Sequence, residues 1–256
     1  MEKEYILFID SGVGGLSTLA EIYQRLDENY IYFADNKNHP YGNKSPEKLC
    51  EILTKIITDV KCHYKLKMVV LACNTATTSV IDSLREKFPE TAFIGTEPAI
   101  KLAENLGYKR ILVLVTKLTS CQPKFKNLVE NTKKIGTIVK VLVVDKFASN
   151  IERNLIENSF LSNFRVLKNL YTIKLNSKNI DSVVLGCTHY CHEKKRIENL
   201  TGKTVLDGNF GVFKRVLTLD KQFALSKSFP VFMLSNSSKF TKQKYVKIFN
   251  QILANK

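Results

Sequence analysis

The sequence lacks the features that mark membrane proteins, secreted proteins and small disulfide-bonded proteins. Its apolar runs are well short of the ~18 residues that a membrane-spanning helix requires. Its first residues, MEKEYILFID, show no secretory signal pattern. The six cysteines do not follow the spacing of a small disulfide scaffold. These absences predict a cytoplasmic protein with reduced thiols and no membrane partner.

Acidic residues are scarce relative to basic ones. The 256 residues include 39 Lys and Arg against 24 Asp and Glu, which gives a formal net charge of +15. Such a charge can indicate nucleic-acid binding. Here the lysines are spread along the whole chain, and no segment interleaves aromatic residues with arginines. We therefore favour a solvated basic surface over a nucleic-acid interface, and a positive field would also attract a small acidic substrate.

Strand-like and helix-like stretches alternate along the chain. Apolar runs predict strands, and amphipathic spacing predicts helices between them, one of which begins at Ser45 as cap with Pro46 at the first helical position. Repeated βα units imply parallel sheets with helices on both faces. The strands are expected at 4–10, 30–35, 68–73, 110–116, 138–144, 181–187 and 229–235, and helices at 16–26, 77–88 and 238–254.

Two strand ends have similar sequences, VVLACNT at 69–75 and VVLGCTH at 183–189. This weak internal repeat predicts two related α/β halves that face each other. The expected crossover points, Pro98 and Asp207, give one domain of residues 1–97 plus 207–256 and a second of residues 98–206. Ligands bind beyond the carboxyl ends of parallel strands. The side chains expected at such an edge are Asp10, Ser11, Cys73, Asn74, Cys187 and Thr188.

The stretch DSGVGGLS at 10–17 follows a strand and opens a helix. It is neither a Walker loop, since no Lys follows the last Gly, nor a dinucleotide fingerprint, since Ser17 stands where the third Gly belongs. Asp10 could hold an ammonium group and Ser11 could bind a carboxylate. This pairing suits an amino acid better than a nucleotide, although a tight structural turn is the alternative.

Cys73 and Cys187 both end apolar runs and precede hydrogen-bonding residues. A strand cysteine is more often a core side chain than a nucleophile, and Cys50 and Cys62 are expected to fill space within a helix. Two thiols that face one small substrate suggest a two-base reaction. One thiolate removes a proton from a carbon, and the other thiol returns a proton to the opposite face.

Two other chemistries are open for the second run, CTHYCH. Cys187 and Cys191 have a spacing that zinc sites use, and His189 and His192 lie beside them. However, no second ligand pair follows at a suitable distance. A Cys–His hydrolase would use Cys187 and give Cys73 no role. The paired thiols therefore favour a reaction without metal.

Five stretches occur in the same order as in a known family across roughly residues 7–210: FIDSGVGGLSTL, YFADNKNHPYG, LACNTATT, GTEPAIK and LGCTHY. Together they resemble the glutamate racemases of the aspartate/glutamate racemase superfamily. The resemblance implies an isomerase with two pseudosymmetric, doubly wound α/β domains and an active site between them. It further implies interconversion of L- and D-glutamate without a cofactor, for peptidoglycan synthesis, cell-wall biogenesis and cell shape. A homodimer is also expected, and racemisation of aspartate or another small carboxylic acid is the alternative.

The resemblance assigns roles to individual residues. It implies that Cys73 and Cys187 are the catalytic acid/base thiols, assisted by Asp10 and His189 respectively. Glu152 is either a further acidic helper or a solvated helix residue, and Thr119 is a weaker candidate for substrate binding. The residues that the resemblance places at the substrate are Asp10, Ser11, Tyr41, Gly42, Asn74, Thr75, Thr188 and His189. Departures from the family pattern fall near 120–125, 144–151 and 191–193.

Overall fold

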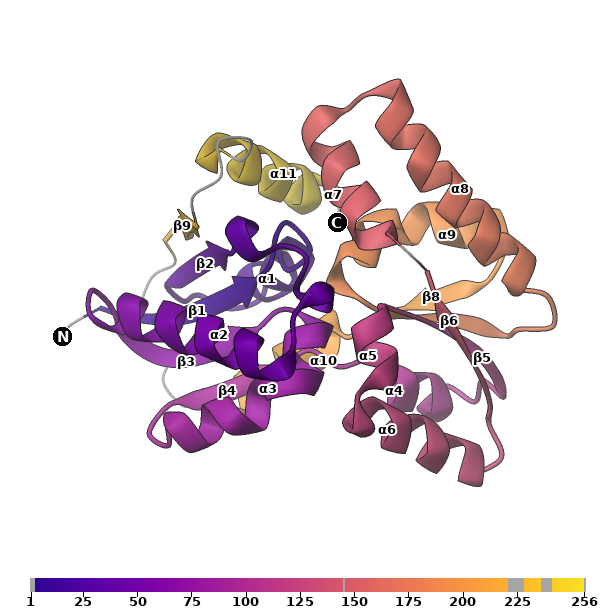
Figure 1. Ribbon diagram of the computed structural model, residues 1–256, viewed down its shortest axis with the longest axis horizontal. Helices are drawn as coiled ribbons and strands as arrows, with labels where there is room; N and C mark the ends of the chain where they lie inside the picture. Colours follow the sequence, from indigo (N-terminus) through magenta and orange to yellow (C-terminus); the bar gives the residue numbers. More distant parts are fainter. Residues whose placement is uncertain (1–2, 145, 221–227, 236–240, 256) are drawn as a thin grey trace. The chain divides into compact units, whose positions relative to one another are not determined.

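The computed structural model of the chain describes residues 3–144, 146–220, 228–235 and 241–255. These fall into two compact units (Figure 1). Unit 1 contains Met1–Thr96 and Asn209–Lys256, and unit 2 contains Glu97–Gly208. Each unit has one parallel sheet flanked by helices, which confirms the predicted α/β class with two mainly parallel sheets. In the described ranges, no helix is both long and apolar enough to cross a membrane.

Unit 1 contains a five-stranded sheet. Its strands are β1 (Glu4–Asp10), β2 (Tyr30–Ala34), β3 (Lys65–Leu71), β4 (Ala92–Gly95) and β9 (Val231–Leu234). They are all parallel, in the order β4-β3-β1-β2-β9, so their carboxyl ends lie at one edge. The helices are α1 (Leu16–Tyr23), α2 (Pro46–Lys61), α3 (Asn74–Lys87), α10 (Asn209–Leu219) and α11 (Lys242–Ala254), with short 3-10 helices η1 (Asn36–Asn38) and η2 (Tyr41–Asn43).

Side chains of β1 alternate between the two faces of this sheet, as strand geometry requires. Leu7 joins a buried cluster with side chains of α2 and α3 on one face. On the other face the ring of Phe8 contacts Tyr30, and Tyr23 of α1 contacts both Tyr30 and Phe249 of α11. Both faces are therefore covered, which explains why residues 6–9 in the middle of β1 are all apolar.

The start of α2 agrees with its prediction. Ser45 caps the helix by accepting a hydrogen bond from Lys48 N at 3.3 Å, and Pro46 occupies the first helical position. Cys50 is buried in the core, as expected. The prediction for Cys62 was wrong, because this residue lies just past the last turn of α2 and is exposed.

Other helix bounds differ from the predicted ones by a few residues. The α1 helix ends at Tyr23 instead of residue 26, and α3 begins at Asn74 instead of residue 77. The earlier start of α3 puts Asn74 and Thr75 inside its first turn, directly after Cys73. The described part of the predicted 238–254 helix is α11, and residues 238–240 lie outside the described residues.

Unit 2 contains a four-stranded sheet. Its strands are β5 (Arg110–Val115), β6 (Ile138–Val143), β7 (Ser182–Gly186) and β8 (Thr204–Leu206). They are parallel, in the order β6-β5-β7-β8. The helices are α4 (Ile100–Asn105), α5 (Lys117–Cys121), α6 (Pro123–Lys134), α7 (Phe147–Glu157), α8 (Phe160–Asn176) and α9 (Lys194–Thr201), with the 3-10 helix η3 (Thr188–Glu193).

The helices of unit 2 also cover both faces of their sheet. Leu112 and Leu114 of β5 belong to a buried cluster with α7, α8 and α9. Ile111 and Val113, which point to the other face, pack with side chains of α4 and α6. The central strands β5 and β7 are consequently buried on both sides, and the carboxyl end of β7 presents Cys187.

Candidate active site

At the carboxyl end of β1, Asp10 is completely buried. Its Oδ1 accepts a hydrogen bond from Gly12 N at 2.8 Å, and Tyr32 donates its hydroxyl proton to Gly12 O at 2.7 Å. A side chain at Gly15 would clash here, because an added Cβ would lie 2.7 Å from Ala72 Cβ and 3.0 Å from Asp10 Cβ. The glycine-rich turn therefore lets α1 approach β3 closely and holds a carboxylate at the edge of the sheet.

Cys73 follows β3, the neighbour of β1, and is the N-cap residue of α3. Only 8% of its surface is exposed. The first N–H groups of a helix lack intrahelical partners and carry partial positive charge, so the start of α3 favours an anion. Asn74 and Thr75 are buried in this first turn, and Asn74 Oδ1 has no hydrogen-bond partner among the described residues. A buried amide oxygen of this kind suits a ligand that brings a donor.

Asp35 organises the segment that carries Tyr41. Its Oδ2 accepts hydrogen bonds from Tyr41 Oη at 3.0 Å and from Asn38 Nδ2 at 2.9 Å, and its Oδ1 accepts one from Ser235 Oγ at 2.6 Å. Burial, followed by the charges of Asp35 and Cys73, raises the pKa of Tyr41 well above its usual 10.0. Tyr41 is therefore a neutral hydroxyl beside the Cys73 thiol at neutral pH.

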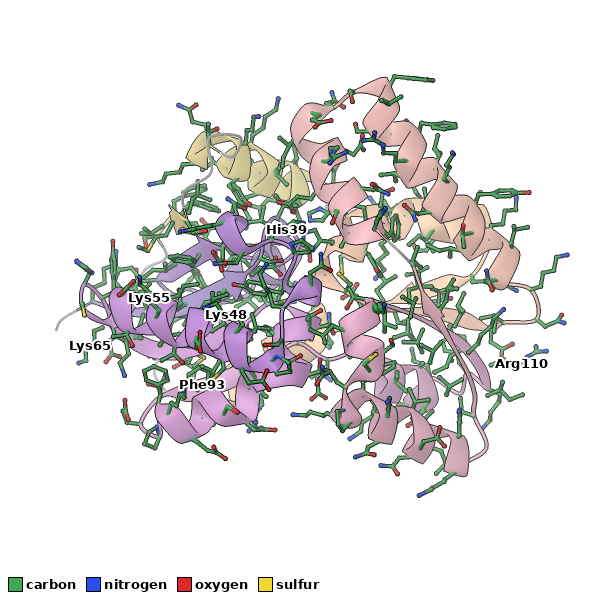
Figure 2. The ribbon with its side chains drawn as sticks, viewed as in Figure 1. His39, Lys48, Lys55, Lys65, Phe93 and Arg110 are labelled. Carbon is green, nitrogen blue, oxygen red and sulfur yellow. The ribbon has the colours of Figure 1, made fainter. Side chains whose placement is uncertain are left out.

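His39 and Ser11 extend this edge of unit 1. His39, labelled in Figure 2, places Nδ1 3.3 Å from Ser11 Oγ. Gly42 follows Tyr41 in η2 and is half-buried. The structure thus brings the predicted residues of unit 1 to one edge of its sheet. Sequence reasoning did not select Asp35 or His39, although both lie within YFADNKNHPYG, and the polar residues of that stretch before Tyr41 were the available signal.

In unit 2, Cys187 lies at the carboxyl end of β7 and caps η3. It is 8% exposed, and Thr188 and His189 after it are buried. Gly186 allows this strand end to pack tightly, since an added Cβ would lie 2.6 Å from Val115 Cγ1 and 2.8 Å from Leu114 O. Cys187 therefore repeats the placement of Cys73 after a buried parallel strand.

His189 forms a buried pair with Glu152 of α7. Its Nε2 lies 2.6 Å from Glu152 Oε2, and each side chain is 4% exposed. The interpretation of Glu152 as a solvated helix residue is therefore wrong. A carboxylate in this position fixes the ring orientation of the imidazole and favours a proton on Nε2.

Thr119 is fully buried at the carboxyl end of β5, within α5. Its hydroxyl lies 2.9 Å from that of Thr116, the N-cap residue of α5. In the same unit, the ring of Tyr190 stacks obliquely against Phe147 with the ring centres 4.8 Å apart, which packs η3 against α7. These contacts hold Thr119 and η3 at the same edge of the sheet as Cys187.

In the described part of the chain, no three ligand atoms of Cys187, His189, Cys191 and His192 come together as a metal-binding group. His189 instead uses Nε2 toward Glu152. The run after His189 is held by ion pairs, because Arg196 lies 2.8 Å from Glu193 and Lys194 lies 2.8 Å from Asp207.

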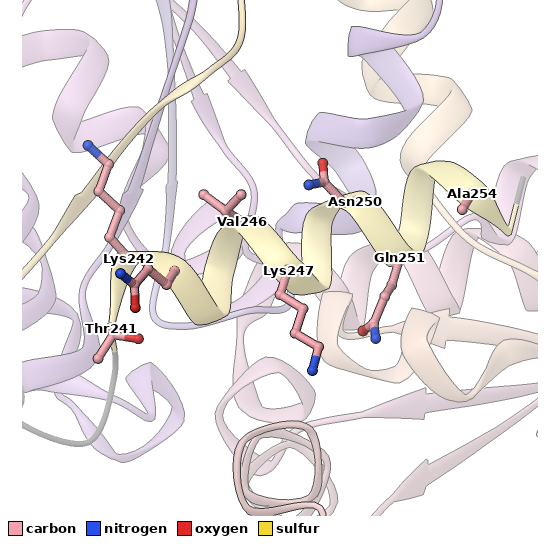
Figure 3. A pocket seen from close by; sticks show the side chains of 8 residues that line it. Thr241, Lys242, Val246, Lys247, Asn250, Gln251 and Ala254 are labelled. Atoms are coloured by element: carbon pink, nitrogen blue, oxygen red, sulfur yellow. The ribbon is translucent and has the colours of Figure 1, made fainter.

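A hollow runs along one side of α11 (Figure 3). None of the predicted site residues lines it. Its lining combines amide, ammonium and hydroxyl groups with two small apolar side chains, from Thr241, Lys242, Gln243, Val246, Lys247, Asn250, Gln251 and Ala254.

Comparison with known proteins places these residues in a family context. The model of the Asp/Glu/Hydantoin racemase family matches residues 10–210. The glutamate racemase of Clostridium novyi is 37% identical over 230 residues, which cover 87% of each chain. The glutamate racemase of Clostridium acetobutylicum is 38% identical over 217 residues, which cover 83% of each chain.

Solved structures agree with this similarity. The structure of Escherichia coli glutamate racemase in complex with L-glutamate and the activator UDP-MurNAc-Ala superposes with a TM-score of 0.80 at 28% identity. The match covers 98% of this chain and 95% of that one. The isoform RacE1 from Bacillus anthracis has a TM-score of 0.82 at 24% identity, over 99% of this chain and 95% of that one, and so shares the fold.

Proposed function

We propose, because this chain belongs to the Asp/Glu/Hydantoin racemase family, that it interconverts L-glutamate and D-glutamate. The observation that carries this proposal is the similarity to curated glutamate racemases over more than four fifths of both chains. The same proposal assigns the reaction to the cytoplasm and its D-glutamate product to peptidoglycan synthesis. Aspartate and other small carboxylic acids are the competing substrates that an assay must separate from glutamate.

The proposed mechanism uses Cys73 and Cys187 as the two proton-transfer groups. A thiolate on one face of the substrate takes the Cα proton and becomes a thiol, while the thiol on the other face donates its proton and becomes a thiolate. The Cα–H bond that breaks is replaced by one on the opposite face, so no electron acceptor is needed. The proposal requires both sulfur atoms to reach one Cα.

The unit 1 residues are suited to hold an amino acid. The Asp10 carboxylate can pair with the substrate ammonium, and the partnerless oxygen of Asn74 can accept a further N–H bond. The N–H groups at the start of α3 and the hydroxyls of Ser11 and Thr75 can bind a carboxylate. The neutral hydroxyl of Tyr41 and the backbone at Gly42 complete this proposed cradle, whose burial strengthens each contact.

The unit 2 residues are suited to assist Cys187. Thr188 offers a hydroxyl and a backbone amide directly after the thiol. His189 can exchange a proton with the thiol while Glu152 stabilises its imidazolium form. A fixed histidine is valuable because the α-proton of an amino acid is a weak acid, and the carbanionic transition state depends on preorganised dipoles.

The test is to incubate the chain with L-glutamate in deuterated water. We expect the optical activity to disappear and solvent deuterium to enter Cα, as read by NMR and chiral chromatography. A parallel panel with L-aspartate and other small acidic amino acids identifies the substrate. Absence of exchange with glutamate from protein with a cooperative thermal transition would contradict the proposal, as would faster turnover of aspartate. The Cys73→Ala/Cys187→Ala double variant is the negative control for exchange that does not depend on the two thiols.

A further inference from the structure

The α8 helix carries a continuous apolar stripe on its outer side. On Figure 1 it lies against α7 and α9 of unit 2. Val166, Leu170 and Ile173 are buried on its inner side. The exposed apolar side chains recur at helical spacing on the opposite side. They are Phe160 (86% exposed), Leu161 (60%), Phe164 (46%), Leu167 (46%), Tyr171 (60%) and Leu175 (54%), which together we name the α8 stripe.

The stripe is large for a solvent-exposed surface. A surface helix normally buries its single apolar face and leaves polar groups outside. Here α8 is apolar on two opposite sides, and the outer one holds two phenylalanines, a tyrosine and three leucines. Contiguous apolar patches of this kind mark interaction sites. Helix stability does not require these side chains, since α8 already has the inner contacts and a capping box at Ser159 and Ser162.

The charges around the stripe are of one sign. Residues 158–180 contain no Asp or Glu, and their cations are Arg165, Lys168, Lys174 and Lys178. Lys168, Lys174 and Lys178 are exposed, and the Lys168 ammonium lies 4.9 Å from the centre of the Phe164 ring. Cations therefore border the apolar stripe directly and can extend to its polar boundary.

Neighbouring elements do not reverse this charge. Arg196 of α9 lies beside α8, with Nη2 3.3 Å from Asn163 Oδ1. Two carboxylates close by are already paired with arginines, because Glu193 of η3 lies 2.8 Å from Arg196 of α9 and Glu157 lies 3.8 Å from Arg153 within α7. A second copy of this helix would bring cations against cations. An anionic surface would instead be attracted by every charge that borders the stripe.

We propose that α8 docks unit 2 onto an anionic phospholipid surface. The helix would lie in the plane of the interface, with the aromatic and leucine side chains among the upper acyl chains and the lysines at the headgroups. This combination of an apolar stripe and flanking lysines is the physical signature of interfacial helices. Electrostatic attraction of the positively charged chain to the anionic surface strengthens this binding. One or two lysines near the surface contribute about one order of magnitude in affinity.

The test uses the full chain and sucrose-loaded vesicles in a sedimentation assay. We expect binding to vesicles of phosphatidylcholine with phosphatidylglycerol, little binding to phosphatidylcholine alone, and weakening as salt is raised. The Phe160→Ser/Tyr171→Ser variant should lower the partition coefficient on the order of tenfold or more. Its control, Leu106→Ser/Ile135→Ser, removes two exposed apolar side chains from another part of unit 2 and should bind as wild type.

A second pair of variants tests the charge. Lys168→Glu/Lys174→Glu should lower binding on the order of tenfold or more, whereas Lys126→Glu/Lys134→Glu on α6 changes the net charge equally and should retain most of it. Equal loss in both pairs would reduce the effect to overall charge and overturn the proposal. Sedimentation velocity without lipid gives the rival outcome. A dimer that Phe160→Ser/Tyr171→Ser dissociates, with no vesicle binding by wild type, would assign the stripe to a second copy.

Discussion

His189 Nε2 lies 2.6 Å from Glu152 Oε2 inside unit 2, and both side chains are almost completely shielded from solvent. The two residues are far apart in sequence, so α7 and η3 must pack correctly before the pair can form. The contact of Tyr190 with Phe147 holds these elements together next to the pair. The packing of unit 2 therefore holds the Glu152 carboxylate against the imidazole of His189.

Replacing Glu152 by Gln keeps the size of the side chain and removes its charge. We expect kcat for glutamate racemisation to fall roughly 100-fold, because the imidazolium loses its stabilising partner. KM should change little, and the pH–rate profile should shift. The control is Glu157→Gln, at an exposed position of the same helix. A variant with lowered melting temperature but unchanged kcat and pH profile would reduce the pair to a structural role.

Replacing either thiol should stop the proposed reaction. Cys73→Ala and Cys187→Ala should each lower racemisation on the order of 1000-fold or more, because each direction needs one group to remove the proton and another to return it. The control is Cys121→Ala, an exposed cysteine on α5. Near-normal turnover in either single variant, measured by chiral chromatography, would exclude the two-thiol mechanism.

Replacing Gly186 or Gly211 by Ala should change the free energy of unfolding in opposite directions. In Gly186→Ala the new Cβ would meet Val115 and the backbone oxygen of Leu114, and we expect a loss of about 1–3 kcal/mol in the free energy of unfolding. In Gly211→Ala, inside α10, nothing lies within 4 Å of the new Cβ, and helix propensity predicts a gain of up to about 1 kcal/mol. Denaturant unfolding measures both, and equal effects would contradict this packing argument.

Asp181 links unit 2 stability to pH. Its hydrogen bond from Arg110, and those from the amides of Arg110 and Lys109, hold its pKa below the usual 3.8. The contribution of the ionised Asp181 to the stability of the folded state is therefore present at neutral pH. It is lost as the pH falls below about 4 through the folded-state pKa. Asp181→Asn should lower the melting temperature at pH 7, and its difference from wild type should shrink toward pH 2–3.

Arg110→Gln checks the cause of that dependence. Removing the guanidinium should take away most of the same pH-dependent component, and combining it with Asp181→Asn should add little. If the two substitutions instead had additive effects on the melting temperature at pH 7, the ion pair would not be the origin of the pH response.

Much of the fold follows from local sequence pattern. The long apolar runs at β1, β3, β5 and β7 are buried on both faces and stand out without alignment. β4 and β8 were not predicted, because AFIG and TVL are too short to show a period. They form because β3 and β7 offer neighbouring edges for hydrogen bonding.

The site was predictable to the extent that it depends on strand ends. Cys73 and Cys187 follow such ends, and their positions agree with that pattern in each unit. Glu152 was not predictable from its own surroundings, because its burial comes from a partner in η3. The exposure of Cys62 was likewise not predictable, because the apolar stripe of α2 does not indicate the residue at which the helix ends.

The division of unit 1 into two chain segments has a consequence for biogenesis. Residues of unit 2 leave the ribosome before α10, β9 and α11, so unit 2 can fold while β2 still lacks its outer neighbour. Until α11 arrives, Tyr23 and Tyr32 lack the rings of Phe249 and Tyr245 that cover them in the finished protein. A released chain truncated after Gly208 should therefore recruit chaperones through unit 1 while unit 2 resists proteolysis.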